Sequence, residues 1–557
     1  MSLDLSSIQK DFPCLILNPK KRERGATAYR LQLPELPWGR EFAWAELLLP
    51  RGFPEHETAS IILSPDAVLR VPHVEITGAL CIEGDPGPGQ GHTAEERIHL
   101  LLLAYHDQFL QPWLAGKLDE DFSKESLNYW TIAVSQKRSN RDPVCAVWTV
   151  DECPNQPNVM EGLLLLPGRL VVANNGKQAI TNRVIQSLGS KAKQRIRVLV
   201  ADIPISHTFT PSTWPSNNAD FERLLNGRLS KPQREQFRRP PRLHGRGVHR
   251  IVLLRNLMCG FAYLLPGGPP TIVEYGAQKR SFPSLSKPLP LSVTRVDPSW
   301  TVGRDQHPVV TQRLSQHVLV FGAGALGSPV VDHLAKAGIG FITLVDPENM
   351  ETTNIGRHLL GAESLDRPKA EAVAERVNLG HPATLVTAKK MSAERWLREN
   401  SLTNFDLILD MTGESDVRWY LDQARLQHSC PLLIGWMEPY VAAAHVCMLP
   451  AGATWMQGFT DPMKNLQAIT WPDEVIQLEP GCSSRFQSYT AAAAAHAIAL
   501  VAEQSLKLLE HSVIESQIIS WVRGQRYLDE HWEGLKLREW ALKAQSQDGI
   551  IIERLFP

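Results

Sequence analysis

The sequence predicts an alternating α/β fold with a parallel sheet in its C-terminal half, preceded by two α+β segments. The apolar run Val318–Phe321 is typical of a buried parallel strand. A glycine-rich turn and an apolar stretch at helical spacing follow it directly. A second apolar run, Phe341–Val345, then ends on Asp346. The order strand, turn, helix, strand and acid predicts one βαβ unit.

The glycine-rich turn predicts the function of this unit. Gly322 permits a tight turn, Gly324 lets the backbone approach a phosphate, and Gly327 lets helix and strand pack closely. The helix N-terminus offers free N–H groups to an anion. Asp346 stands where a carboxylate grips a ribose hydroxyl. The pattern therefore predicts a Rossmann-like nucleotide-binding site.

The residues after Asp346 argue against a nicotinamide cofactor. They supply an amide (Asn354), a guanidinium (Arg357) and an amine (Lys369), which suit the charge of a triphosphate rather than a neutral ring. The alternative is an ordinary solvated loop and helix start.

Together, these residues make the stretch from Arg304 to Leu509 resemble the ThiF and ubiquitin-activating adenylyltransferase superfamily. The resemblance implies ATP and Mg²⁺ as cofactors. It implies that Asp346 holds the ribose, that Asn354 and Arg357 hold phosphates, and that Lys369 neutralises charge at the attacked α-phosphate. Arg304 stands where the family often carries an arginine that reaches into a partner subunit's site, so a homodimer is expected.

One residue of the family's pattern is replaced. Gly413 stands where the family usually has a metal-binding aspartate, in the turn after the run that ends on Asp410. Asp410, Glu414 or Asp416 serves the magnesium instead, or the metal is held mainly by ATP and water. The metal ligand is therefore left unassigned.

Composition bounds the class of protein. The chain has 557 residues, a net charge of −1 and 43% apolar residues, which indicates three or four ordinary domains and neither a nucleic-acid binder nor a disordered chain. Its N-terminus lacks a secretory signal pattern, and its apolar runs are too short to span a bilayer. Eight cysteines without a CxxC pair exclude the structural zinc of many sulfur-carrier adenylyltransferases and suit a reducing cytoplasm.

Residues 1–118 are expected to form an α+β domain. A short helix (3–12) and strands at 29–33, 42–49 and 60–63 precede Pro72-His73-Val74, Gly78, Leu80-Cys81 and a long helix (93–114). This order resembles a ubiquitin-conjugating core and implies that Cys81 is the catalytic cysteine. Pro72-His73-Val74 replaces His-Pro-Asn, so a backbone N–H, Thr77 or His73 is left to stabilise the oxyanion. The alternative for Cys81 is a buried small hydrophobe.

Residues 119–299 are expected to form a β-rich α+β linker domain. Its β-like runs lie at 129–134, 146–150, 163–173, 197–203, 250–254 and 271–275. The sequence shows no catalytic constellation here, which predicts a spacer.

Residues 300–510 form the expected adenylation domain, and its last long helix follows Cys482. In compact ubiquitin-activating enzymes the thioester cysteine stands in this arrangement, and a nearby helix N-terminus lowers a thiol pKa. The alternative is a buried cysteine at a helix start. Residues 511–557, with Trp521, Trp532 and Trp540, are expected to form a helical tail.

An adenylating site and two candidate thioester cysteines in one chain indicate ATP-dependent protein conjugation. The C-terminal carboxylate of a carrier protein, with a Gly-like end, would be adenylated, passed to Cys482, then to Cys81, and finally to a target lysine. The domain order resembles bacterial fusions found with CD-NTase anti-phage systems (CBASS), so the carrier is a CD-NTase or a ubiquitin-like protein. The alternatives are a sulfur-carrier adenylyltransferase and a nucleotide-binding scaffold.

Overall fold

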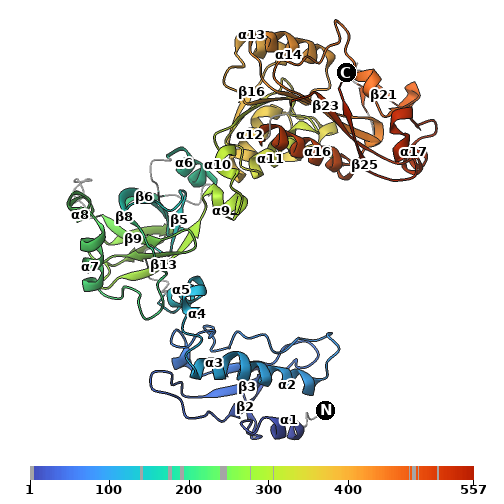
Figure 1. Cartoon of the computed structure of the whole chain (residues 1–557). Coiled ribbons are helices and arrows are strands. Elements are labelled where there is room, and N and C mark those ends of the chain that lie inside the picture. The colour runs from blue at the N-terminus through green and yellow to red at the C-terminus, as the bar shows by residue number, and fades with distance from the viewer. Residues whose placement is uncertain are drawn as a thin grey trace. The chain divides into compact units, whose positions relative to one another are not determined.

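The computed structural model describes residues 5–137, 142, 144–173, 178–187, 194–238, 248–275, 278–304, 306–475, 477–478, 485–486, 489–510 and 514–556. The chain divides into two compact units (Figure 1). The first contains Met1–Gly176 and Lys191–Arg295, and the second contains Lys177–Ser190 and Val296–Pro557. Each unit is described separately.

The first unit begins with a meander of antiparallel strands. Its elements are α1 (Ser6–Asp11), β1 (Lys20–Lys21), β2 (Thr27–Leu31), β3 (Ala45–Leu49), β4 (Ser60–Leu63), α2 (Ala94–Ala104), a π-helical segment (Tyr105–Leu110) and α3 (Gln111–Leu114). The strand order is β1-β2-β3-β4. The three predicted strands and the long helix are present, and β1 is an addition to them.

The long helix closes over one face of this sheet. Thr93 and Glu96 form a reciprocal capping box that satisfies two N–H groups at the start of α2. Leu47 and Ile61 of the sheet and Phe109 of the helical segment are all fully buried in one apolar cluster. The helix thus anchors the loop 64–93, which carries Cys81, against a packed core.

A closed barrel follows, with strand order β10-β13-β5-β7-β6-β8-β9. Its strands are β5 (Ala146–Thr149), β6 (Asn158–Leu166), β7 (Leu170–Ala173), β8 (Gln194–Pro204), β9 (His249–Arg255), β10 (Gly260–Leu264) and β13 (Leu289–Arg295). A hairpin of β11 (Thr271–Tyr275) and β12 (Gln278–Phe282) and helices α4 (Asp121–Lys124), α5 (Ser126–Lys137), α7 (Asn218–Arg228) and α8 (Lys231–Arg238) complete it. The predicted run 163–173 is two strands joined by a turn.

The prediction of a strand at 129–134 is wrong, because these residues lie in helix α5. Their aromatic and β-branched side chains favour a strand locally. In the fold, Tyr129, Trp130 and Ala133 are buried at helical spacing. Trp130 Nε1 also donates to the carbonyl of Leu291, 2.9 Å away on β13. Packing against the barrel therefore overrides local preference.

The second unit is built on an eight-stranded sheet of order β16-β15-β14-β17-β18-β19-β23-β25. Its strands are β14 (His317–Phe321), β15 (Phe341–Val345), β16 (Leu385–Lys389), β17 (Leu407–Asp410), β18 (Leu432–Met437), β19 (Ala443–Leu449), β23 (Gln517–Val522) and β25 (Ile550–Leu555). Its helices include α6 (Gln178–Ser187), α9 (Pro298–Gly303), α10 (Val310–Arg313), α11 (Gly327–Lys336), α12 (Lys369–Gly380), α13 (Ala393–Glu399), α14 (Ser415–Gln427), α15 (Met463–Leu466), α16 (Ala491–Glu510) and α17 (Gln525–His531). Strands β14 to β18 are parallel neighbours, which confirms the predicted Rossmann-like arrangement.

After His317, strand β14 is apolar because helices cover both faces of the sheet. Val318 and Val320 belong to the cluster that α11, α12 and α16 build on one face. Leu319 and Phe321 belong to the cluster of α13 and α14 on the other. Alternate residues of one strand thus enter opposite cores, as a central parallel strand requires.

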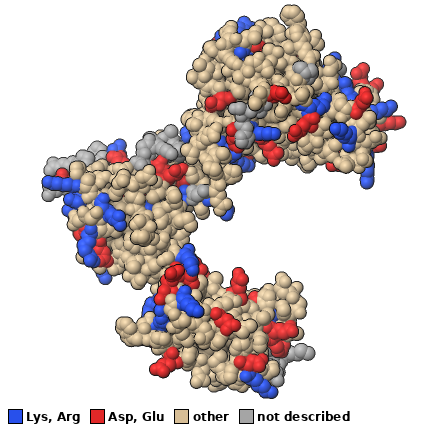
Figure 2. All heavy atoms as spheres, viewed as in Figure 1, with Lys and Arg blue, Asp and Glu red and all other residues tan. Residues whose placement is uncertain are grey.

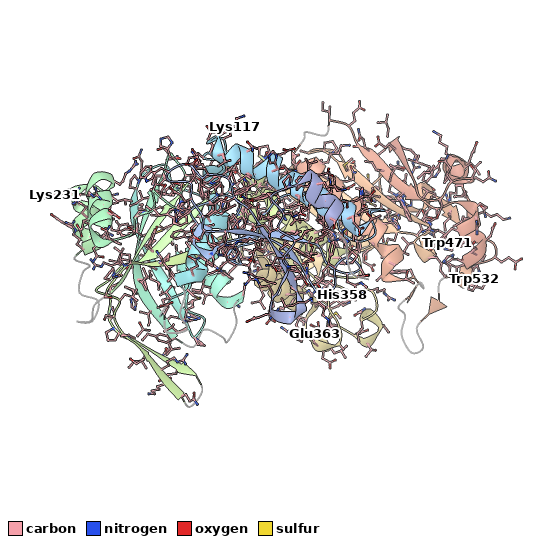
Figure 3. The ribbon with its side chains drawn as sticks, turned by 90° about the horizontal axis from the view of Figure 1, so that it is seen from below. Lys117, Lys231, His358, Glu363, Trp471 and Trp532 are labelled. Carbon is pink, nitrogen blue, oxygen red and sulfur yellow. The ribbon has the colours of Figure 1, made fainter. Side chains whose placement is uncertain are left out.

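The expected helical tail at 511–557 is not what forms. Strands β23 and β25 add to the sheet beside β19, and Trp521 lies in β23. Trp532 follows α17 and packs in a small cluster with Trp471 (Figure 3). Ile518, Ile519 and Trp521 belong in a sheet because β19 offers an unpaired edge, which a sequence pattern does not reveal.

Helix α16 confirms the last long helix expected after Cys482, and it bears on the expectation that no apolar run is long enough to span a bilayer. Among the described residues, it is long and apolar enough by composition to cross a membrane, with a mean hydropathy of 1.2. Ala494, Ala497 and Val501 are nevertheless buried in the core on the β19 side of the sheet. In this fold α16 is a core helix.

Candidate active sites

The glycine-rich loop lies at the carboxyl end of β14, where the chain crosses to either side of the sheet. Strand β14 pairs with β15 on one side and with β17 on the other. In open α/β sheets, ligands bind in the crevice at the carboxyl ends of the strands, at the point where the strand order reverses along the sheet. The loop runs from β14 into α11, so the N-terminus of that helix faces the same crevice.

The glycines of the loop have distinct physical roles. Gly322 has a φ of +93°, and a Cβ there would lie 2.9 Å from the backbone of Met411. A Cβ on Gly327 would lie 2.0 Å from the carbonyl oxygen of Gly322, which no side chain could occupy. A Cβ on Gly324 would meet nothing within 4 Å. Two glycines are thus required by packing, and the middle one leaves open space for a ligand.

Asp346 is held as the sequence pattern suggests, at the end of β15. Its Oδ2 accepts a hydrogen bond from the N–H of Ala323 at 2.7 Å, and its Oδ1 accepts one from the N–H of Glu348 at 2.8 Å. The side chain is buried, and this burial raises the pKa of Asp346 despite those hydrogen bonds. The carboxylate therefore supports the glycine loop itself.

Lys369 is the first residue of α12 and is buried. Its Nζ lies 2.5 Å from Oε2 of Glu348, and its backbone N–H donates to the carbonyl of Glu348 at 2.9 Å. The lysine side chain is 7% exposed, whereas that of Glu348 is 65% exposed. A buried cation at a helix N-terminus is disfavoured by the helix dipole, so this amine needs an anion beside it.

The segment between β15 and α12 is fastened to the glycine loop by two side chains. His358, labelled in Figure 3, places Nε2 2.5 Å from the carbonyl oxygen of Ala323, and its Nδ1 accepts from the N–H of Leu360. Ser328 Oγ donates to the carbonyl of Gly324 and accepts from the N–H of Leu359. Burial lowers the pKa of His358. These contacts and Glu348 were missed by sequence reasoning, since nothing local marks them.

Asn354 and Arg357 lie on this fastened segment. Asn354 Oδ1 accepts from the N–H of Glu351 at 3.0 Å, which turns the NH₂ end of its amide away from that bond. Arg357 is half-buried, and its guanidinium lies 5.4 Å from the centre of the Tyr489 ring. Both side chains are positioned by local structure and not merely solvated.

Asp410 ends β17 beneath the same loop and is fully buried. Its Oδ1 accepts from the N–H and hydroxyl of Thr412, at 3.0 and 2.6 Å. Its Oδ2 has no hydrogen-bond partner, and burial raises its pKa. Arg418 donates to Asp461, and its Nη1 is likewise unpartnered. An unpartnered buried carboxylate oxygen fits a cation or a bridging water.

The other acidic candidates for magnesium lie on the surface. Glu414 and Asp416 are exposed. Gly413 has a φ of +76°, a conformation that aspartate adopts only at a cost, although the space around it is open. The described residues contain no cluster of three or more His, Cys, Asp or Glu side chains that could hold a metal. Among the three predicted carboxylates, Asp410 is thus the buried one.

Two predicted residues of this unit lie apart from these contacts. Arg304 is exposed and caps α9 in the left-handed region, with a φ of +48°. Cys482 lies outside the described residues. The paired strands β21 (Gln477–Leu478) and β22 (Arg485–Phe486) flank the stretch that contains it.

Cys81 is the exposed member of the seven described cysteines, which argues against a buried small hydrophobe. It follows a turn that glycine makes possible, because a Cβ on Gly78 would lie 2.7 Å from the carbonyl oxygen of Leu63. The N–H of Cys81 donates to the carbonyl of His73 at 2.7 Å. Burial raises the pKa of the Cys81 thiol, and the charges of Glu75, Glu125 and Glu83 raise it further.

His73 connects this turn to helices α4 and α5. Its φ of +60° is uncommon for a residue with a side chain, and its N–H donates to Tyr129 Oη at 2.9 Å. Its Nε2 lies 3.2 Å from Asp121 Oδ2, and its Nδ1 lies 3.4 Å from Glu125 Oε1. The imidazole is therefore engaged by two carboxylates, which leaves the predicted oxyanion role to be tested.

Comparison with known proteins defines the class of the second unit. Residues 305–516 match the model of the ThiF family, so the chain carries a ThiF-family domain. A protein of Pseudomonas aeruginosa, "ATP-dependent ubiquitin transferase-like protein Cap2", is 25% identical over 470 residues, which cover 80% of this chain and 81% of that protein. A Cap2 of Enterobacter hormaechei is 29% identical over 32% of this chain and 29% of its own length.

A further relative shares only part of this chain. The "Adenylyltransferase and sulfurtransferase UBA4" of Yarrowia lipolytica is 36% identical over 122 residues, which are 21% of this chain and 30% of that protein. The similarity to the Pseudomonas Cap2 is longer than the ThiF match itself. It therefore extends into the N-terminal half of the chain.

Proposed function

We propose that this chain is an ATP-dependent protein-conjugating enzyme. It adenylates the C-terminal carboxylate of a carrier protein, takes the acyl group onto Cys482 as a thioester, passes it to Cys81, and delivers it to a target lysine. The observation that carries this proposal is the presence in one chain of a ThiF-family site with a buried Lys369 and an exposed thiol, Cys81. Similarity to Cap2 over most of the chain supports it.

In the adenylation step, the side chains would act through charge and position. The N–H groups at the start of α11 face the phosphates, with Gly324 leaving room for them. Lys369 exchanges the carboxylate of Glu348 for a phosphate oxygen and stabilises negative charge at the α-phosphorus. Asn354 and Arg357 hold the other phosphates, and Asp346 meets the ribose. Magnesium, held near Asp410, would supply further charge neutralisation.

The transfer steps use two thiols in turn. The Cys482 thiolate attacks the acyl-adenylate, so that a C–S bond forms and AMP leaves. The Cys81 thiol then displaces Cys482, and the amine of a target lysine finally displaces Cys81. A carrier with a Gly-like C-terminus suits such a relay, and we propose a CD-NTase or a ubiquitin-like protein, with a role in anti-phage defence in the cytoplasm.

The proposal is tested with a purified carrier protein, ATP and magnesium. Formation of a reducible adduct between carrier and chain, together with ATP–pyrophosphate exchange, is the expected result. Exchange without any reducible adduct would instead favour a sulfur-carrier adenylyltransferase, the class that the name "Sulfur carrier protein ThiS adenylyltransferase" of an Escherichia coli relative prints. Absence of both would reduce the chain to a nucleotide-binding scaffold.

A further inference from the structure

The two cations of the candidate nucleotide site differ in what holds them. Lys369 pairs with the carboxylate of Glu348. Within the described part of the chain, no carboxylate pairs with Arg357, and its guanidinium lies over the ring of Tyr489, with 5.4 Å between the guanidinium carbon and the ring centre. An anion must displace Glu348 to reach Lys369, whereas a phosphate near Arg357 meets no such competitor among these residues.

The backbone that carries Arg357 is fixed on the glycine loop by the two residues that follow it. His358 places Nε2 2.5 Å from the carbonyl oxygen of Ala323, and the N–H of Leu359 donates to Ser328 Oγ at 3.3 Å. These contacts fix where the arginine side chain starts. They do not order its long, flexible end, which requires a contact of its own.

Tyr489 supplies that contact from the other side of the site. It stands two residues before α16, and its ring packs against the apolar cluster that α11 and α16 share. These two helices lie side by side in Figure 1. Burial raises the pKa of the Tyr489 hydroxyl, although the charge of Arg357 works in the opposite direction. The ring is therefore uncharged at neutral pH, and it acts on the guanidinium through its face.

An aromatic face orders a guanidinium without neutralising it. It attracts the positive charge through the quadrupole of the ring and supplies no carboxylate oxygen, so the forked N–H donors stay available for a phosphate. Figure 2 shows Lys and Arg side chains interspersed with Asp and Glu on the visible face of the second unit. Capture of a polyphosphate thus depends on individually placed cations rather than on the general charge of that face.

We propose that Tyr489 is the positioning residue that orders Arg357 for the β- and γ-phosphates of ATP. Tyr489 itself touches no substrate and acts only through the arginine. This inference rests on the proposed function, in which Lys369 serves the α-phosphate and Arg357 the other phosphates. It adds a residue from the start of α16 to a site whose other members come from the glycine loop and from the segment that follows β15.

The test is a titration of the full chain with magnesium-ATP and, separately, with AMP, which lacks the β- and γ-phosphates. We expect Tyr489→Leu to weaken ATP binding about 5-fold and to leave AMP binding unchanged. Tyr489→Phe keeps the ring face and should bind both nucleotides as the unchanged chain does. Tyr29→Leu, which removes a half-buried tyrosine of the first unit, is the matched control.

A double-mutant cycle with Arg357→Ala separates positioning from a general structural role. In the Arg357→Ala background, Tyr489→Leu should weaken ATP binding no further. Tyr489→Met removes the ring while retaining a long apolar side chain, and it serves as a second variant with the same expectation if Tyr489→Leu does not fold.

Three results would overturn the proposal: equal losses for ATP and AMP, a further loss in the Arg357→Ala background, or a loss in Tyr489→Phe as large as in Tyr489→Leu. If the unchanged chain binds neither ATP nor AMP, the proposed function fails instead. The two failures are thereby distinguished.

Discussion

At the scale of residues, a buried lysine is the distinctive feature of the candidate nucleotide site. Lys369 opens α12, where the partial positive charge of the helix terminus opposes it, and it is nearly inaccessible to water. Glu348 is the counter-charge that makes this placement tolerable, and it is mostly exposed and free to move aside. In the proposed function, Lys369 would exchange this carboxylate for a phosphate oxygen.

Lys369→Ala is expected to abolish adenylation. Losing one such contact to developing charge costs on the order of 3 kcal/mol, which is about a 100-fold loss of rate. ATP–pyrophosphate exchange with the carrier protein measures it. Lys507→Ala, a substitution of an exposed lysine on α16, should leave exchange unchanged. Near-normal exchange in Lys369→Ala would remove this residue from the mechanism.

The site residues that sequence predicted are those whose spacing has a physical reason. Gly322 and Gly327 are demanded by backbone contacts that any such turn makes. His358 and Glu348 could not be predicted, because each acts through a partner far away in sequence. His358 contacts Ala323, 35 residues before it, and Glu348 contacts Lys369, 21 residues after it.

At the scale of elements, the glycines of the loop have different roles: Gly327 is required by packing, and Gly324 leaves room for a ligand. Gly327→Ala is expected to destabilise the second unit by at least about 2 kcal/mol, because its Cβ would overlap the carbonyl oxygen of Gly322. Gly324→Ala should fold normally, since its Cβ meets open space, yet weaken ATP binding. Thermal unfolding and nucleotide titration of both variants separate the two effects. Equal stability of the two variants would contradict this assignment.

The helices α11 and α12 that carry the site are joined by a charged contact. Asp332 on α11 faces His381 at 3.2 Å and Lys336 at 2.7 Å. The hydrogen bond from His381 is the largest of the contributions that lower the pKa of Asp332 to about 2. A lowered folded-state pKa stabilises the fold above the unfolded pKa of 3.8, and this stability is lost as pH falls through about 2.

Asp332→Asn should therefore cost on the order of 2 kcal/mol at neutral pH. Urea unfolding at several pH values tests this expectation. The difference in the free energy of unfolding between Asp332→Asn and the unchanged chain should shrink as pH falls from about 4 towards about 2. A gap of constant size would show that the carboxylate charge is not what stabilises the contact.

Elements were predictable where local pattern and tertiary packing agree. Strand β14 enters opposite cores with alternate residues, and its apolar run Val318–Phe321 already indicates this. Helix α5 was mistaken for a strand because Tyr129 and Trp130 favour strands, while the barrel packs them at helical spacing. Strands β23 and β25 form because β19 offers an open edge for pairing. Their own sequence does not indicate this edge, since it lies in a distant part of the chain.

For the whole molecule, the proposed function joins two chemistries in one chain. The ThiF-family domain lies in one compact unit, and the exposed thiol of Cys81 lies in the other. The placement of Cys482 in the expected adenylation domain and of Cys81 in a different domain indicated a relay. The contribution of α5 to the Cys81 site could not be foreseen, because it comes from contacts between Tyr129 and His73 across 56 residues.

A homodimer is expected, motivated by Arg304. This arginine is exposed at the end of α9, as a side chain that completes a partner's site must be. Sedimentation should show a dimer, and mixing Arg304→Ala with Lys369→Ala chains should restore about a quarter of the activity if each site borrows the partner's arginine. A fully active monomer would refute this expectation.

The most direct measurement follows the two thioesters on non-reducing gels, with ATP and the carrier protein. Cys482→Ala should keep ATP–pyrophosphate exchange but form no thioester, including none on Cys81. Cys81→Ala should accumulate the Cys482 thioester while the amide product disappears. If Cys482→Ala still loads Cys81, the acyl group passes directly from the adenylate to Cys81 and the two-step relay is wrong.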